Sequence, residues 1–230
     1  MIVDHDNRRV LEVLENREKA TVKAYLEKAR PGILAGVVEI TVDMWDAYAN
    51  AAREVFPEAS VTVDRFHVMK NFQDGLTRAR RELQKKLSDE ERKLLKGSRW
   101  LWTTNPENLS AEKKAELAAL QLRFPDLARI SECRETLRAI FEDKSIADPS
   151  EGRRQLREWM EKTRQLGMKS LDQFLGTLGN WMDEIANYFR SRSSNGRTEG
   201  FNRGIRAILW RTFGMTNFAN FRLRVLHGFG

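Results

Sequence analysis

The chain has 230 residues, of which 41% are hydrophobic and 32% charged, a composition that supports one substantial core or two smaller ones. Its single cysteine, Cys133, excludes an intramolecular disulfide framework and a zinc site built from several thiolates. No run approaches the ~18 consecutive apolar residues of a membrane span, and the opening MIVDHDNRRV lacks the apolar run of a signal peptide. We therefore expect a protein of the cytoplasm with no membrane partner.

The charge balance is the first indication of a partner. Forty Lys and Arg residues against thirty-three Asp and Glu residues leave a net charge of +7 and a sequence pI near 9.7. Such an excess favours a polyanion such as nucleic acid. The alternative is a set of solvated basic helix faces without such a partner, so the positions of the charges must decide.

The first sixty-five residues alternate strand and helix signals. MIVD and RRVLEVLE predict two short strands around an HDN turn, and REKATVKAYLEKA predicts a helix that ends at Pro31 and Gly32. VVEITVD then predicts a strand, residues 45–55 a helix, and VTVD a second strand. A strand, a crossover helix and another strand normally form a parallel pair within one sheet.

Each of these two strands ends in an aspartate, Asp43 or Asp64. Open α/β sheets bind ligands at the carboxyl edge of their strands, so both residues are candidates for a site. The alternative role is a helix N-cap. The N-cap alternative is strong for Asp64, which opens the RFHVMKNF helix. It is weaker for Asp43, because Asp46 is better placed to cap the next helix.

From Arg65 to Tyr188 nearly all of the sequence predicts helix, with individual helices expected at 110–121, 126–141, 151–165 and 169–190. Ser110 is the expected N-cap of the first of these. Two tryptophans in this part, Trp100 and Trp102, could stack on DNA bases. We expect core positions for them, as is usual for tryptophan in a helical block.

After Tyr188 a polar SRSSNG loop leads into a helix that starts near Arg197. Gly200, Gly204 and Ala207 form a smooth strip on that helix, which would let it approach a sheet closely. We expect this approach to hold Glu199 inward beside a cluster of arginines. The chain then ends in a tail that mixes arginine and phenylalanine.

Asp43 and Glu199 together suggest a metal-dependent chemistry. Two carboxylates from distant parts of a chain are what a two-metal phosphodiester site requires, because divalent ions about 4 Å apart need hard oxygen ligands. Arginines beside Glu199 suit a phosphate backbone. The alternative is that both carboxylates are ordinary surface residues.

Two strings strengthen the first interpretation. VDMWDAYANAAREVFPEASVTVDRFHVMK and SNGRTEGFNRGIRAILWRTFGMTNFANFRLRVL resemble the bacterial insertion-sequence DDE transposases, and LLKGSRWLWTTNPENLS resembles the insertion of that family. The resemblance covers nearly all of the chain. It implies an α/β fold, dominated by helix overall, in which a ribonuclease H-like core with a small mixed sheet is interrupted by a large all-helical insertion. Residues 1–75 and 186–230 would form the core and residues 76–185 the insertion.

Carried over by position, the family's second catalytic aspartate falls on Asp43 and its catalytic glutamate on Glu199, and these two would hold Mg²⁺ or Mn²⁺. The DRFH segment matches a DxxH pattern, which makes Asp64 and His67 accessory residues; the alternative for His67 is a surface position on its helix. The nucleic-acid contacts that we expect are Asn195, Arg197, Asn202, Arg203, Arg206 and Arg211.

One feature of the family is not matched. Its first catalytic aspartate lies on a first strand upstream of the segment that resembles MIVDHDNRRVLEVLENR. Asp4 and Asp6 lie in a turn and do not fill that position. The resemblance therefore implies an N-terminally truncated transposase with its first strand missing and an incomplete two-metal site.

Three interpretations remain open at this point. The first is an enzyme that cuts and joins transposon DNA, with transposon ends and target DNA as its partners. Such an enzyme would lie in the bacterial cytoplasm and associate with the nucleoid when it acts on DNA. The second is a non-catalytic remnant that binds DNA, or oligomerises with a second copy or an intact transposase and interferes with it. The third, an unrelated basic helical protein, is disfavoured by the paired strings.

Overall fold

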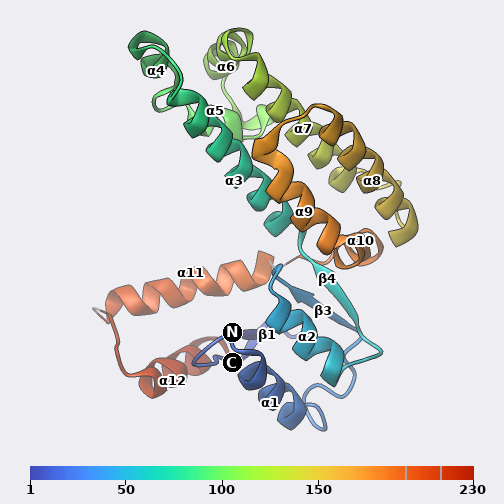
Figure 1. Cartoon of the computed structure of the whole chain (residues 1–230). Coiled ribbons are helices and arrows are strands. Elements are labelled where there is room, and N and C mark those ends of the chain that lie inside the picture. The colour runs from blue at the N-terminus through green and yellow to red at the C-terminus, as the bar shows by residue number, and fades with distance from the viewer. Residues whose placement is uncertain (195, 213) are drawn as a thin grey trace. The chain divides into compact units, whose positions relative to one another are not determined.

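The computed structural model describes residues 1–194, 196–212 and 214–230, with only the backbone of Arg197. The chain divides into two compact units, residues 1–64 with 192–230 and residues 65–191. Figure 1 shows the course of the chain through them. The boundaries lie at 64/65 and 191/192, and the roles of core and insertion that we predicted for the two parts stay predictions.

The first unit contains two small sheets and four helices among its described residues. They are β1 (Ile2–Asp4), β2 (Arg9–Glu12), α1 (Lys19–Ala29), β3 (Glu39–Val42), α2 (Asp46–Val55), β4 (Ser60–Val63), α11 (Gly196–Arg211) and α12 (Phe218–Phe229). β1 pairs antiparallel with β2, and β3 pairs in parallel with β4. The predicted hairpin and the predicted parallel pair are confirmed, but they are two separate two-stranded sheets.

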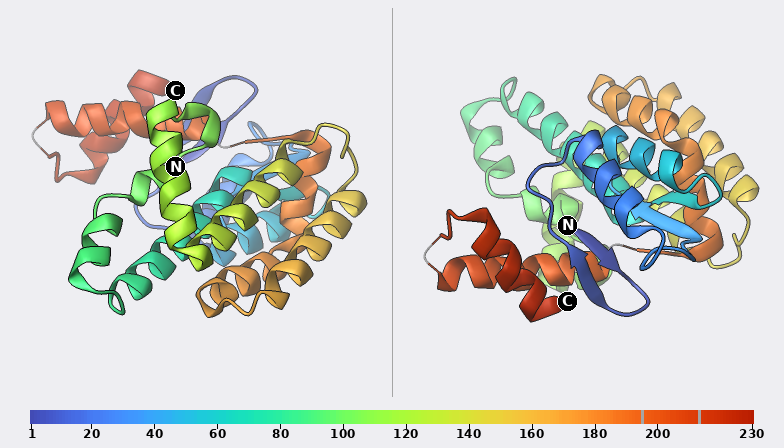
Figure 2. Two further views of the ribbon diagram at one scale, coloured as in Figure 1. Left: turned by 90° about the horizontal axis from the view of Figure 1, so that it is seen from above. Right: turned by 90° about the horizontal axis from the view of Figure 1, so that it is seen from below.

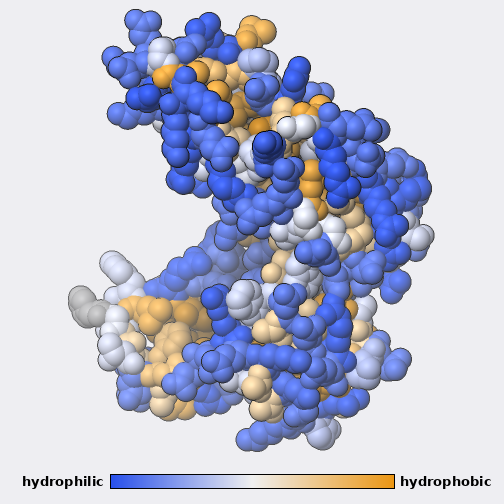
Figure 3. All heavy atoms as spheres, viewed as in Figure 1, coloured by the Kyte–Doolittle hydropathy of each residue, from blue (hydrophilic) through white to orange (hydrophobic). Residues whose placement is uncertain are grey.

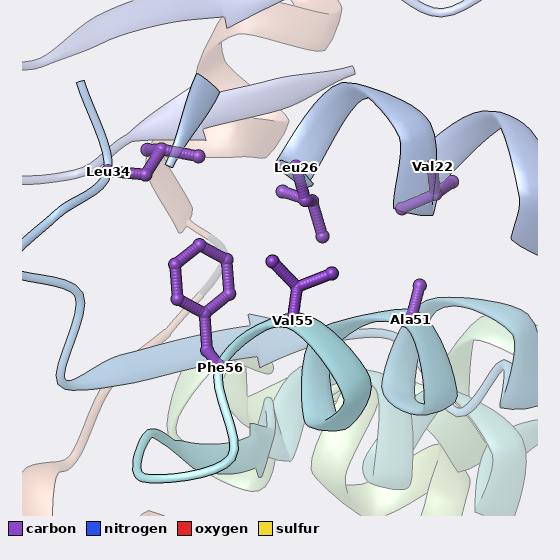
Figure 4. Close-up of a cluster of buried hydrophobic side chains, with 6 residues drawn as sticks. All are labelled: Val22, Leu26, Leu34, Ala51, Val55 and Phe56. Carbon is purple, nitrogen blue, oxygen red and sulfur yellow. The ribbon is translucent and has the colours of Figure 1, made fainter. Parts of the chain in front are cut away.

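The helix α2 connects β3 to β4 and buries one face against α1. Val22 and Leu26 of α1 point toward Ala51 and Val55 of α2, and the ring of Phe56 extends the cluster (Figure 4). Ile40 of β3 packs against the same group. Each fully buried side chain of this size contributes about 1.5–3 kcal/mol relative to exposure, so the cluster anchors the parallel pair to both helices.

The second unit is built from helices joined by short turns. Its elements are α3 (Arg65–Gln84), α4 (Asp89–Leu95), α5 (Arg99–Thr103), η1 (Pro106–Asn108), α6 (Ala111–Arg123), α7 (Pro125–Glu142), α8 (Pro149–Gln165), η2 (Lys169–Leu171), α9 (Asp172–Asn180) and α10 (Met182–Ser191). The helices α7 to α10 lie side by side in both views of Figure 2. The chain as a whole is therefore dominated by helix with small sheets, as predicted.

Aromatic side chains hold the centre of the helical unit. The rings of Phe72, Trp159 and Phe174 meet edge to face at centroid distances of 5.0–6.0 Å, and Phe141 stacks on Phe189 at 5.7 Å. The indole N–H of Trp159 donates to the hydroxyl of Thr136 at 2.9 Å. Its buried polar atom therefore has a partner, as a core tryptophan requires.

Several local expectations have clear outcomes. The hydroxyl of Ser110 accepts from the backbone N–H of Lys113 at 3.3 Å, which confirms the predicted cap. The single helix predicted for 169–190 is wrong, since η2, α9 and α10 occupy that range and the backbone leaves helical geometry at Trp181. Gly179 and Asn180, which precede Trp181, are weak helix formers.

Only one of the two tryptophans assigned to the core lies there. Trp102 is 2% exposed and Trp100 is 69% exposed, so the assignment is wrong for Trp100. Residues two apart on an α-helix point about 200° apart. One short helix therefore cannot bury both.

The helices α8 and α10 pack closely at Gly152. A Cβ at Gly152 would overlap Cδ2 of Phe189. Gly152→Ala should therefore destabilise the protein by about 1–3 kcal/mol, through overpacking, as measured by urea unfolding.

Gly176→Ala is the matched control, because a Cβ at Gly176 in α9 meets no atom within 4 Å. It should leave stability unchanged or raise it by about 0.5–1 kcal/mol. Equal unfolding midpoints for the two variants would contradict the close packing of α8 on Phe189.

Candidate functional site

The parallel pair β3–β4 has one apolar face and one polar face. Thr41 pairs with Thr62 and Val42 with Val63, and paired residues of neighbouring strands point to the same side. Side chains alternate along each strand, so Asp43 and the residues that share its face form a polar set: Glu39, Thr41, Asp43, Ser60, Thr62 and Asp64. Asp43 follows β3 directly and Asp64 follows β4 directly.

Glu39 connects this polar face to the beginning of α11. Its Oε1 accepts from the hydroxyl of Thr62 at 2.6 Å, and its Oε2 accepts from the hydroxyl of Ser193 at 2.6 Å. Ser193 lies in the segment that leads into α11. The chain entering the helix of Glu199 is therefore held on the face of the sheet that also carries Asp43.

The first turn of α11 is held from a second direction by the β1–β2 hairpin. Nε2 of His5 and the hydroxyl of Thr198 are 3.2 Å apart. The hairpin and α12 also share an apolar cluster, in which Val10 and Val13 pack with Val225. The partly buried side chains around this cluster are Met1, Val3, Phe201, Ile205, Ile208, Phe218, Phe221, Leu226 and Phe229. Figure 2 shows the hairpin beside the α11–α12 pair.

The expectation for the smooth strip on α11 is wrong. A Cβ at Gly204 would lie 2.5 Å from Cζ of Phe229, so the strip receives an aromatic ring of α12, and Gly200 has nothing within 4 Å. The sequence pattern did not predict α12. The side-chain oxygen of Asn217 caps this helix by accepting from the backbone N–H of Asn220 at 3.0 Å. The helix packs on another helix at this point.

Glu199 is partly buried and partly exposed. Its side chain is 40% exposed, and Oε1 lies 3.5 Å from Nη1 of Arg206. The predicted association of Glu199 with an arginine is thus present in one pair. An exposed pair of this kind contributes about 0–1 kcal/mol, so both groups can rearrange toward a ligand at low cost.

Asp43 is exposed and lies within electrostatic range of the amine of Met1 and of Tyr48. Burial lowers the pKa of the Met1 amine, while the carboxylates of Glu12 and Asp43 oppose this effect. Burial also raises the pKa of Tyr48, and Asp43 raises it further. The charge of Asp43 therefore acts on the start of β1 and on α2.

The accessory residues differ in their surroundings. Asp64 is 2% exposed and follows β4, whereas His67 is partly buried in the first turn of α3. The ring of His67 meets the edge of Phe66 at 5.6 Å. Asp64 belongs to the first unit and His67 to the second, so a shared role for them stays a prediction.

The predicted nucleic-acid contacts lie on or before α11. Arg203, Arg206 and Arg211 are exposed, and Asn202 is partly buried. Asn195 and the side chain of Arg197 lie outside the described part of the chain. The three exposed arginines are available to an anionic partner.

Sequence patterns missed the ion pair between Glu12 and Arg222. Both carboxylate oxygens of Glu12 accept from the guanidinium at 2.5 Å, and this pair ties α12 to β2. Burial would raise the pKa of Glu12, but hydrogen bonds from Arg222 and the N–H of Val13 outweigh it and lower the pKa. No local signal links residues 210 positions apart.

Asp4 is also committed to a structural role. Its carboxylate accepts from the N–H groups of Asp6 and Asn7 at 3.1 and 3.0 Å and from the side chain of Asn7. The hydrogen bonds from the backbone N–H of Asn7 and then from its side chain lower the pKa of Asp4. The residue shapes the β1–β2 turn, in agreement with its exclusion from the predicted site.

The described residues include no group of three or more His, Cys, Asp or Glu side chains arranged to hold a metal ion. Asp43 and Glu199 nevertheless supply the hard carboxylate oxygens that Mg²⁺ and Mn²⁺ prefer. The chemical type of these donors therefore suits Mg²⁺ or Mn²⁺. A complete ligand set is not found among the residues that the structure describes.

The fold and site define a helix-dominated chain with two small sheets, a carboxylate on a strand end and a second carboxylate on a late helix. The family model DDE_Tnp_ISL3, described as transposase, matches residues 1–225. The chain belongs to this transposase family.

Individual relatives agree with the family. The chain is 25% identical over 232 residues to the transposase for insertion sequence element IS1001 of Bordetella parapertussis, covering 100% of this chain and 56% of that protein. It is 26% identical over 183 residues to the transposase for IS1557 of Mycobacterium tuberculosis, covering 70% and 40%. The chain thus spans about half the length of these curated relatives or less. No solved structure matches it.

Among the helices that the structure describes, none combines the length and apolar character needed to cross a bilayer.

Proposed function

We propose that this chain is part of a DNA transposase, in which Asp43 and Glu199 are two carboxylates of a two-metal DDE site that cuts and joins transposon DNA. The observation that carries the proposal is the attachment of the α11 segment to the polar face of β3–β4 through Glu39, Thr62 and Ser193. This attachment relates a helix late in the chain to the strand of Asp43. The membership in a transposase family supplies the reaction class.

The proposal gives each residue a physical role. Asp43 and Glu199 would hold the ions, with Asp64 and His67 as accessory residues. The chemistry that Mg²⁺ or Mn²⁺ supplies in such a site is activation of a water or 3′ hydroxyl and stabilisation of the leaving oxygen. Arg203, Arg206 and Arg211 would neutralise phosphates and keep the DNA beside Glu199.

The same proposal extends to the architecture and the partners. The antiparallel pair β1–β2 and the parallel pair β3–β4 would be the two parts of a ribonuclease H-like sheet, and the helical residues 76–185 its insertion. Transposon ends and target DNA would be the partners, with a second copy or a longer transposase as protein partner. The protein would then cut and join DNA at the nucleoid.

A second candidate is a DNA-binding or oligomerising chain without catalysis. It is favoured by one observation: the described residues include no group of three or more His, Cys, Asp or Glu side chains arranged to hold a metal ion. Two ligands fix two bridged ions poorly. DNA binding and catalysis are therefore tested separately.

DNA binding should depend on salt and little on sequence, because phosphate contacts dominate it. Replacing Arg203 and Arg206 together by Gln should weaken binding and reduce the slope of log Kd against log salt by about 1.8, since each phosphate contact contributes about 0.9. Fluorescence anisotropy of a labelled duplex measures both quantities.

The matched control removes two exposed cations from the end of α1, with Lys28→Gln and Arg30→Gln. This variant should keep the slope of the unaltered chain. An unchanged slope for the Arg203 and Arg206 variant would remove these arginines from the interface and contradict the proposed DNA face of α11.

Strand joining by this chain should stay at background with Mg²⁺ or Mn²⁺, because the described residues include no group of three or more side chains arranged to hold a metal ion, and two carboxylates fix two bridged ions poorly. The measurement is a nicking and joining assay on labelled DNA, with Asp43→Asn as the comparison. Robust metal-dependent joining that Asp43→Asn abolishes would contradict the incomplete site. It would mean that another residue, such as Asp64, completes the ligand set.

A further inference from the structure

The positive charge of the helical unit is concentrated at its beginning. Residues 65–103, which form α3 to α5, contain eleven Lys and Arg against five Asp and Glu, whereas residues 104–191 contain fourteen against fifteen. The excess of six positive charges thus belongs to α3–α5 alone. The surface over α3 and α4 is mostly hydrophilic in Figure 3.

Three arginines of this segment, Arg80, Arg81 and Arg99, lie close enough for their charges to interact. Nη1 of Arg80 donates to the backbone oxygen of Leu95 at 3.1 Å, and its Nε is buried without a hydrogen-bond partner in the described chain. Burial lowers the pKa of Arg80, and the positive charges of Arg81 and Arg99 lower it further. No carboxylate of the described residues forms an ion pair with any of the three.

Such a cluster costs free energy, because like charges near one another repel and Arg80 is partly desolvated. Most other arginines of the unit have carboxylate partners: Arg138 contacts Glu107, Glu135 and Glu142, and Arg154 contacts Glu151 and Glu158. An anion bound at α3–α5 would relieve the repulsion. The cluster therefore points to an anionic ligand.

Trp100 lies next to this cluster with its ring exposed. The neighbouring side chains Leu101 and Trp102 are buried, and the indole N–H of Trp102 donates to the hydroxyl of Ser98 at 3.1 Å, which fixes the rotation of α5. This rotation leaves Trp100 69% exposed. The guanidinium of Arg99 lies 5.3 Å from the centre of its ring.

We propose that α3–α5 form a second nucleic-acid surface, in which Arg81 and Arg99 neutralise phosphates and Trp100 stacks on an unpaired base. Guanidinium groups match phosphate geometry, and an exposed aromatic ring beside cations is the combination that binds single-stranded nucleic acid. The surface belongs to the helical unit, whereas Asp43, Glu199 and the arginines of α11 belong to the other unit. It rests on DNA as the partner but not on the proposed two-metal site.

The test compares a labelled 20-nucleotide single strand with a duplex of the same sequence. Trp100→Ala should weaken binding of the single strand about tenfold, within the roughly 1–3 kcal/mol that stacking contributes, and weaken duplex binding less. Trp100→Phe should restore most of the loss, because its ring can still stack. The side chain is exposed, so the thermal midpoint of unfolding should not change.

Arg81→Gln with Arg99→Gln should reduce the salt slope for the single strand by about 1.4, from about 0.7 per contact. The control, Arg129→Gln with Arg164→Gln, removes the same charge from the same unit at exposed arginines that have acidic neighbours. Its slope should not change. Equal slopes for the two double variants, or equal loss of duplex and single strand with Trp100→Ala, would overturn the proposal.

Two further results distinguish this surface from the DNA face of α11 and from a surface that binds protein. If Arg81→Gln with Arg99→Gln leaves DNA binding unchanged while Arg203→Gln with Arg206→Gln weakens it, the proposal for α3–α5 is wrong. The proposed DNA contacts of α11 would then be supported. If an acidic polypeptide such as polyglutamate binds more tightly than the single strand and needs the same residues, the partner is an acidic protein. That result would also overturn the assignment to nucleic acid.

Discussion

The carboxylate of Glu39 is the interaction on which the predicted site depends. It accepts from Thr62 on the neighbouring strand and from Ser193 ahead of α11, so one side chain links residues from three distant parts of the sequence. Hydrogen bonds to a charged acceptor contribute about 1.5–3 kcal/mol each. The hairpin contact of His5 with Thr198 and the apolar cluster around Val225 also help to position the helix of Glu199.

This arrangement leaves the candidate carboxylates accessible while their supports are buried or paired. Thr62 and Asp64 are buried, Glu12 is tied to Arg222, and Asp43 is exposed. A ligand site that must admit DNA needs reacting groups at the surface on elements that are held rigidly from behind. The unit formed by residues 1–64 and 192–230 meets this requirement on the polar face of β3–β4.

Local patterns predicted most of this frame. Alternating polarity and turn residues located the four strands that the structure describes, and the crossover helix implied the parallel pairing that the register confirms. The smooth strip of α11 was misassigned because its contact is the ring of Phe229, on a helix that a sequence mixing arginine and phenylalanine did not reveal. Trp100 was misassigned because the prediction used only the general tendency of tryptophan to be buried. The orientation of the short helix α5 about its own axis decides which of its two tryptophans is buried. Glu39 and the pair of Glu12 with Arg222 depend on contacts between distant residues, for which one sequence carries no signal.

The central claim is that Asp43 and Glu199 hold the same metal ions, and a double-mutant cycle on Mn²⁺ binding tests it most directly. Free Mn²⁺ can be followed by electron paramagnetic resonance in the unaltered chain, in Asp43→Asn, in Glu199→Gln and in the double variant, with the exposed Glu58→Gln as control. Each single variant should weaken the tightest site on the order of tenfold or more, and the double variant should lose little beyond either. Single variants that leave binding unchanged, or losses that add in full, would show that the two carboxylates do not share a site.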